Sequence, residues 1–226
     1  LLQRKDEILP LLEGDFSYIG SKLAAYEGAV IDMPFAFWQY RTPANCQGIP
    51  GMLASASTLF RFLQVTNSPN GLSDSGIARF QPYYYQSADE LGAPGIEMGH
   101  IRHLLTHTDF FPLILPRGVR PVYQDTAMQD VKAWMESEAK GIMLVYGGND
   151  PWTAGAYPVG GEDIHFMTVP GGNHGANFTY LPGPQKDEAI AVLSRWLGKG
   201  PVPPSTLARE RTLEEVELEA VRNRRF

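Results

Sequence analysis

Several kinds of chemistry are excluded by what the sequence lacks. It has one cysteine, Cys46, among 226 residues, so neither an internal disulfide nor a thiolate metal framework can form. The adjoining residues include no base or cation that would activate this thiol, and we expect a buried or incidental cysteine. No apolar run approaches the roughly 18 residues that cross a bilayer, so no membrane span is predicted.

Positive charge is also scarce. The formal net charge is -6, whereas binding to the phosphates of nucleic acid requires a positively charged surface. Nucleic acid is therefore not an expected partner. Hydrophobic residues make up 43% and charged residues 19% of the chain, which is typical of a globular protein. The length is sufficient for one sizeable core, or for a core with a smaller subdomain.

The chain has neither an initiating methionine nor a signal peptide at its beginning. It starts at Leu1, followed by Leu2 and Gln3. This start indicates a segment cut from a longer protein, so the missing signal leaves the location of that protein open.

The first 75 residues predict helices and irregular segments. Residues 1–12 fit the end of a helix, and residues 29–40 are dense in apolar and aromatic side chains. Residues 52–65 place their apolar side chains at helical spacing. A largely helical N-terminal region is therefore expected.

The next segment predicts one strand and one short helix. The aromatic residues at 78–86 suit a strand, and Pro82 indicates an edge position or a strand start. A helix is predicted at 96–107, where three histidines would share one face: His100, His103 and His107. Such a face can bind zinc, but no nearby motif resembles a catalytic metal site, so no metal is predicted.

A regular alternation of elements occupies residues 126–197. A helix is predicted at 126–140, and the apolar run 142–146 suits a strand that is buried on both faces of a parallel sheet. A second strand is predicted at 164–169 and a helix at 184–197. This order predicts an α/β domain, with a parallel sheet flanked by helices.

Each of these strands ends in a glycine-rich loop with one ionisable side chain. Asp150 follows the first strand, and His174 follows the second. Loops at the carboxyl ends of parallel strands meet at one edge of the sheet. The order Asp, then His, is that of an α/β-hydrolase triad after its serine. Either loop alone would fit a turn with an idle side chain, but the two together favour catalysis.

The chemistry of a triad requires these residue types. A serine hydroxyl becomes a good nucleophile when an imidazole takes its proton, and a carboxylate orients and stabilises that imidazole. The serine itself is missing, because no G-x-S-x-G motif occurs in the chain. Ser21, Ser75 and Ser87 all lack the glycines of such a turn. We therefore expect the nucleophile upstream of residue 1.

Four motifs resemble those of a known family. They are residues 33–40 (MPFAFWQY), 83–92 (YYYQSADELG), 146–152 (YGGNDPW) and 171–175 (GGNHG). Together they resemble the secreted bacterial prolyl tripeptidyl aminopeptidases, which are serine exopeptidases. The resemblance extends over roughly residues 25–197. It departs from the family at the serine motif, which matches nothing in this chain.

The resemblance implies a fold, an activity and a location. It implies the C-terminal part of an α/β-hydrolase, with residues 1–75 in a helical cap, 76–198 in the hydrolase core and 199–226 as a charged tail. Asp150 and His174 match the catalytic acid and base of the family. The implied substrate is a peptide with a free N-terminus, no cofactor is implied, and the implied location is secreted or periplasmic.

An aminopeptidase must also bind the positively charged N-terminus of its substrate, for which a carboxylate is the natural partner. Glu90 is the first choice, because it follows the strand predicted at 78–86, and Gln86 would assist it. Asp32 is the second choice. Two tryptophans are candidates for an apolar pocket that accepts proline or another small residue: Trp38 and Trp152. Each of these side chains also fits an ordinary structural role.

Two other functions compete with the exopeptidase. An esterase or lipase would use the same fold and triad, since a fold does not fix the substrate. A hydrolase-like binding module without a nucleophile is the alternative outside enzymes. A serine motif upstream of residue 1 would separate the enzymes from the binding module.

Overall fold

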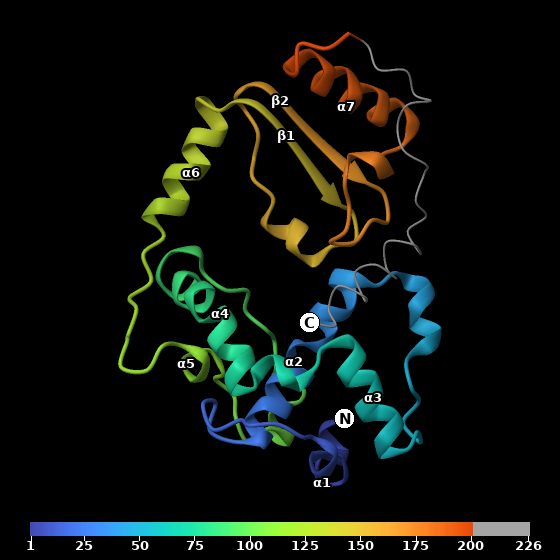
Figure 1. Ribbon diagram of the computed structural model, residues 1–226, viewed down its shortest axis with the longest axis vertical. Coiled ribbons are helices and arrows are strands. Elements are labelled where there is room, and N and C mark those ends of the chain that lie inside the picture. The colour runs from blue at the N-terminus through green and yellow to red at the C-terminus, as the bar shows by residue number, and fades with distance from the viewer. Residues whose placement is uncertain (201–226) are drawn as a thin grey trace. The chain divides into compact units, whose positions relative to one another are not determined.

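The computed structural model describes residues 1–200 in two compact units (Figure 1). The first unit comprises Leu1–Phe37 and Gln47–Gln129, and the second comprises Trp38–Cys46 together with the residues from Asp130 onward. Residues 76–129 thus pack with the N-terminal segment. The predicted cap and core boundaries stay a prediction, and the predicted tail lies almost wholly outside the described residues.

The first unit is helical. Its helices are α1 (Lys5–Ile8), α2 (Lys22–Tyr40), α3 (Ala56–Thr66), α4 (Asp74–Gln86) and α5 (Phe111–Ile114), and the last residues of α2 belong to the second unit. The helical character predicted for the first 75 residues is therefore confirmed. None of the helices in residues 1–200 is long and apolar enough to cross a membrane.

Side-chain caps explain where several of these helices begin. Ser21 accepts a hydrogen bond from the backbone N–H of Ala24 at 3.0 Å at the start of α2, and Ser55 accepts one from Thr58 at the start of α3. Such caps satisfy N–H groups that have no partner within the helix. Ser21 thus has a structural role at the start of α2.

The prediction of a strand at 78–86 is wrong, because these residues form most of α4. Ser73 caps this helix by accepting from the N–H of Gly76, and Ile77 is completely buried. Pro82 stands inside the helix, where it removes one backbone donor. The cap and the buried side chain outweigh both this loss and the strand preference of the tyrosines.

The prediction of a helix at 96–107 is also wrong. Only Arg102–Leu104 form a short 3₁₀ turn, and the backbone around it is irregular. The three histidines of this segment therefore do not form a common helical face. The backbone near residue 106 is bonded instead to a buried glutamate of α2.

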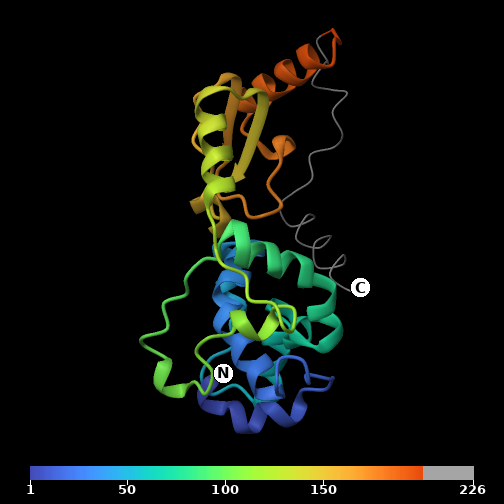
Figure 2. The same ribbon diagram turned by 90° about the vertical axis from the view of Figure 1, so that its left-hand side faces the viewer.

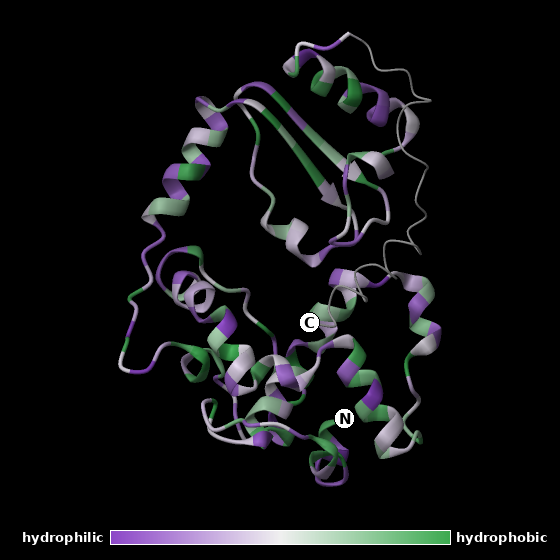
Figure 3. Ribbon diagram, viewed as in Figure 1, coloured by the Kyte–Doolittle hydropathy of each residue, from purple (hydrophilic) through white to green (hydrophobic). Residues whose placement is uncertain are grey.

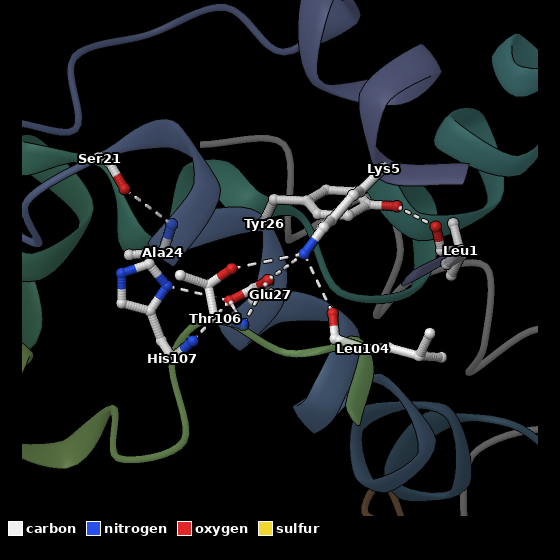
Figure 4. A network of polar contacts seen from close by, with 9 residues as sticks. All are labelled: Leu1, Lys5, Ser21, Ala24, Tyr26, Glu27, Leu104, Thr106 and His107. Carbon is white, nitrogen blue, oxygen red and sulfur yellow. Dashed lines mark hydrogen bonds and ion pairs between the residues drawn. The ribbon is translucent and has the colours of Figure 1, made fainter. Parts of the chain in front are cut away.

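This glutamate, Glu27, is completely shielded from solvent and binds donors from two distant segments (Figure 4). Lys5 Nζ donates to it at 2.9 Å, and the backbone N–H groups of Thr106 and His107 donate at 3.0 and 2.9 Å. His107 Nδ1 lies 3.0 Å from its second oxygen. Glu27 thereby fastens both α1 and the irregular segment to α2.

An apolar cluster surrounds this polar network. It combines side chains from the N-terminal turns, α2, α3 and α4. Its most buried large members are Ile8, Leu12, Ile19, Tyr26, Leu63 and Ile77. This cluster is the core of the first unit, and burial of such side chains is the main source of its stability.

The second unit contains a parallel two-stranded sheet. Its elements in chain order are α6 (Thr126–Ser137, of which the first residues belong to the first unit), β1 (Lys140–Gly147), β2 (Glu162–Val169) and α7 (Gly183–Trp196). The strands pair in parallel from Lys140 opposite Glu162 to Gly147 opposite Val169. They run between α6 and α7 in both views (Figures 1 and 2). The predicted order of helix, strand, strand and helix is confirmed.

Burial in this sheet differs from the prediction. Both strands contain hydrophobic segments (Figure 3), but the five central residues of β1 are half-buried rather than buried. The reason is that β1 has one paired strand, β2, within residues 1–200. In α7 the buried apolar residues are Ala189, Ile190 and Val192. Leu197, the last residue of the predicted helix, is 70% exposed.

Candidate active site

The register of the sheet brings the two glycine-rich loops together. Because β1 and β2 are parallel and end as partners, the loops that follow them leave the same edge. The N–H of Gly148 donates to the carbonyl of Val169 at 3.0 Å, and the N–H of Asn149 donates to that of Gly172 at 2.8 Å. These bonds tie the loop of Asp150 to the loop of His174.

Asp150 and His174, the two predicted catalytic residues, are directly hydrogen-bonded. Nδ1 of His174 lies 2.7 Å from Oδ2 of Asp150. The carboxylate side chain is 9% exposed, whereas the imidazole side chain is 43% exposed. An ionised carboxylate only accepts hydrogen bonds, so Nδ1 is the donor. In the neutral ring this leaves Nε2 with a lone pair that can take a proton.

The second oxygen of Asp150 has a separate partner. Oδ1 accepts a hydrogen bond from the N–H of Trp152 at 3.1 Å, so that Asp150 caps the short 3₁₀ helix Pro151–Gly155. Thr153 further fixes the loop, because its hydroxyl donates to the carbonyl of Gly147 at 2.8 Å. The orientation of the carboxylate is thus determined before any partner approaches the imidazole.

Glycine is required where the two loops are closest. A Cβ on Gly147 would overlap the carbonyl oxygen of Asn173, so no larger residue fits at the end of β1. Gly171 has a φ of 68°, in the left-handed region that favours glycine. These two glycines let the loop of His174 turn back against the end of β1.

The end of α2 forms a third side of this site, which was not predicted from the sequence. The N–H of His174 donates to the carbonyl of Gln39 at 2.8 Å, and Nδ2 of Asn173 donates to the carbonyl of Tyr40 at 3.1 Å. The ring of Tyr40 meets the imidazole edge to face, with centroids 5.7 Å apart. Tyr40 lies in a motif that the sequence marked as aromatic, but not as adjacent to His174.

Asp32 lies in the first unit, on α2, beside polar and aromatic groups. Burial raises the pKa of its carboxyl, and a 3.1 Å hydrogen bond from Asn67 opposes that rise without cancelling it. Burial also raises the pKa of the Tyr84 hydroxyl, with added repulsion from Tyr83 and Asp32. Both shifts have burial as their main cause.

The other predicted substrate residues occupy scattered positions. Gln86 is the last residue of α4 and is exposed, and Glu90 is half-buried in a π-helical turn, Ser87–Leu91. Glu90 therefore does not follow a strand, which removes the argument that first selected it. In the second unit, Trp38 and Trp152 are 38% and 40% exposed. Trp152 is adjacent to Asp150 through its backbone.

No metal centre is found in residues 1–200, where no three histidine, cysteine or acidic side chains are grouped to hold an ion. His107, from the predicted zinc face, is bonded to Glu27 instead. Cys46 is exposed, so it is an incidental cysteine rather than a buried one.

Comparison with known proteins defines the class as a peptidase. The family model described as PS-10 peptidase S37 matches residues 12–212. A curated relative, the prolyl tri/tetrapeptidyl aminopeptidase of Streptomyces mobaraensis, is 33% identical over 214 residues. That alignment covers 88% of this chain and 45% of the relative, so the chain spans about half of the relative's length. No solved structure matches the chain.

The chain belongs to the S37 family of peptidases, because the family model covers most of its length. The resemblance to prolyl tripeptidyl aminopeptidases, predicted from four short motifs, is thereby confirmed. All four motifs lie within the matched residues. The mixed helices and parallel strands are compatible with the predicted α/β class.

Proposed function

We propose that this chain is the C-terminal part of a serine exopeptidase with an α/β-hydrolase core, which removes short peptides from free N-termini. The observation that carries the proposal is the 2.7 Å hydrogen bond between Asp150 and His174 at the shared edge of two parallel strands. Membership of a peptidase family supports it. The nucleophilic serine would come from residues outside this chain.

In the proposed reaction, Nε2 of His174 takes the proton of the serine hydroxyl as its oxygen attacks the peptide carbonyl. Asp150 keeps the imidazole oriented and stabilises its protonated form. The imidazole then gives the proton to the departing amine as the C–N bond breaks, which leaves an acyl-enzyme. A water molecule attacks the acyl-enzyme, gives its proton to Nε2, and the serine is restored.

Two observations support a hydrolase core with more strands than β1 and β2. One concerns β1 and the other concerns the length of the curated relative. The apolar residues of β1 are half-buried, and β1 pairs with one strand within residues 1–200. The curated relative is about twice as long as the aligned segment. Further strands beside β1 would bury its apolar side chains and bring a serine to the same edge of the sheet.

Glu90 and Asp32 both stay candidates for the carboxylate that binds the substrate N-terminus, with Gln86 as an assisting side chain. The raised pKa of Asp32 means that burial disfavours its charged form. A bound ammonium group would remove this penalty. Trp38 and Trp152 stay candidates for an apolar pocket, since both residues are partly exposed.

The first test is labelling of the full-length gene product with a fluorophosphonate, which reacts with activated serines. Labelling is expected in the wild type and should be lost in His174→Ala. His165→Gln is the matched control, because His165 also pairs with carboxylates, Asp163 and Glu188, at 3.0 and 3.1 Å. Absence of labelling in folded wild-type protein would reject the serine enzyme and favour a binding module.

A second measurement separates the peptidase from an esterase. Peptides with free and acetylated N-termini are incubated with the enzyme, and the products are identified by mass spectrometry. Release of short N-terminal fragments from the free peptides alone is expected. Hydrolysis of esters without cleavage of any peptide would favour the esterase. A secreted or periplasmic location is expected as well, and cell fractionation with an antibody would test it.

A further inference from the structure

The carbonyl groups at the end of α2 have partners in the loop of His174. Carbonyls in the last turn of a helix have no N–H partner within the helix and must bond elsewhere. The carbonyl of Gln39 accepts from the N–H of His174, and that of Tyr40 accepts from the side chain of Asn173. The helix end and the histidine loop therefore satisfy each other's polar groups.

Asn173 is held at both ends of its amide. It is 4% exposed, and its Nδ2 donates to the carbonyl of Tyr40. Its Oδ1 accepts from the N–H of Gly175 at 2.9 Å. The backbone on both sides of His174 is consequently fixed relative to the last turn of α2.

The ring of Tyr40 is in direct contact with the imidazole ring of His174. The two rings are at 77° to each other with centroids 5.7 Å apart, an edge-to-face arrangement that is favourable for aromatic groups. Because the imidazole is 43% exposed, this contact limits the directions in which it can turn. The negative end of the helix dipole also favours a positive charge nearby, and the imidazole acquires one during the proposed reaction.

We propose that Tyr40 and Asn173 are positioning residues that hold His174 in line for proton transfer. The proposal rests on the proposed function, because it assigns these residues a role in that reaction. Asn173 fixes the backbone and Tyr40 fixes the ring, while Asp150 fixes Nδ1. A purely structural role would change the stability of the protein and leave kcat of the folded enzyme unaltered.

The test measures kcat and KM of the full-length enzyme on a peptide substrate, per folded molecule as judged by circular dichroism. Tyr40→Leu removes the ring and should lower kcat by about two- to tenfold with KM unchanged. Tyr40→Phe keeps the ring and should retain wild-type kcat. Phe166→Leu is the control, because it removes another aromatic contact of this unit, the 5.1 Å stacking on Tyr146. It should leave kcat unchanged.

Asn173→Asp tests the second residue with little change in volume. It keeps an acceptor for Gly175 but places a carboxylate oxygen opposite the carbonyl of Tyr40, so kcat should fall at least about tenfold. If this variant fails to fold, the Tyr40 series decides the outcome. Wild-type kcat in Tyr40→Leu, or a rise in KM alone, would overturn the proposal.

His174→Ala separates failure of this inference from failure of the proposed function. Loss of activity in His174→Ala, with full activity in the positioning variants, would reject the positioning role and leave the triad intact. Retained activity in His174→Ala would reject the triad, and the positioning role with it.

Discussion

Replacing Glu27 by glutamine is expected to destabilise the first unit strongly. Glu27 is completely buried and accepts hydrogen bonds from Lys5, Thr106 and His107. Removing one partner of a buried ion pair costs about 3–5 kcal/mol, because the other charge is left uncompensated. The side chains of Lys5 and His107 are 24% and 30% exposed, so water can partly replace Glu27. We therefore expect the lower end, about 3 kcal/mol.

The assay is thermal unfolding, followed by calorimetry or circular dichroism. For about 150–250 residues, each 1 kcal/mol lowers Tm by about 2–4 °C, so Glu27→Gln should lower it by roughly 6–12 °C. The matched control is Glu7→Gln in the same unit. Glu7 also pairs with a cation, Arg4, at 2.6 Å, but its side chain is 56% exposed. Exposed pairs contribute little, so the control should melt as the wild type does.

The effect of pH supplies an independent check on the same residue. Burial raises the pKa of Glu27, but the hydrogen bonds from Lys5, Thr106 and His107 outweigh burial, and the net pKa lies below its ordinary value of 4.5. A lowered pKa in the folded state means that the charged group stabilises the protein above pH 4.5 and that this contribution is lost at lower pH. The difference in Tm between wild type and Glu27→Gln should therefore shrink on acidification. Equal melting of Glu27→Gln and Glu7→Gln at pH 7 would refute the reasoning.

Three further predictions concern the proposed enzyme. Asp150→Asn should lower kcat by about 10⁴-fold with little change in KM, as in triads where the imidazole loses its orienting carboxylate; steady-state kinetics near wild-type values would exclude this role. Asp32→Asn should raise KM for peptides with a free N-terminus and leave kcat unchanged, and acetylated peptides, which lack the ammonium group, serve as the control substrate. Gly147→Ala should reduce kcat because the added methyl group overlaps the carbonyl of Asn173 and displaces the histidine loop. Gly183→Ala is its control, since no atom lies within 4 Å of a Cβ there, and equal kcat in the two alanine variants would contradict the close approach.

The parts of the candidate site that depend on short stretches of sequence could be predicted. Two apolar runs bounded by glycines predict β1 and β2, and the loop after each carries its ionisable residue within a few positions of the strand end. Because the strands are parallel, the order of elements alone places Asp150 and His174 at one edge. The hydrogen bond between their side chains is seen only in the tertiary structure.

Where the prediction failed, local preference conflicted with tertiary contacts. Tyr83, Tyr84 and Tyr85 favour a strand, but the cap at Ser73 and the burial of Ile77 produce a helix. The histidine spacing at 96–107 suits a helix, yet the nearby backbone is bonded to Glu27, which lies 79 positions before Thr106. No short sequence window contains both partners.

The sequence by itself determined the peptidase family, the alternation of helices and strands in the second unit, and the positions of Asp150 and His174 in the loops after the two strands. These features depend on hydrophobic periodicity and on motifs of a few residues. The tertiary structure decided which carboxylate is buried and which groups surround His174. Tyr40 and Asn173 are 133 positions apart in the chain, and only folding brings the helix end and the histidine loop within hydrogen-bonding distance.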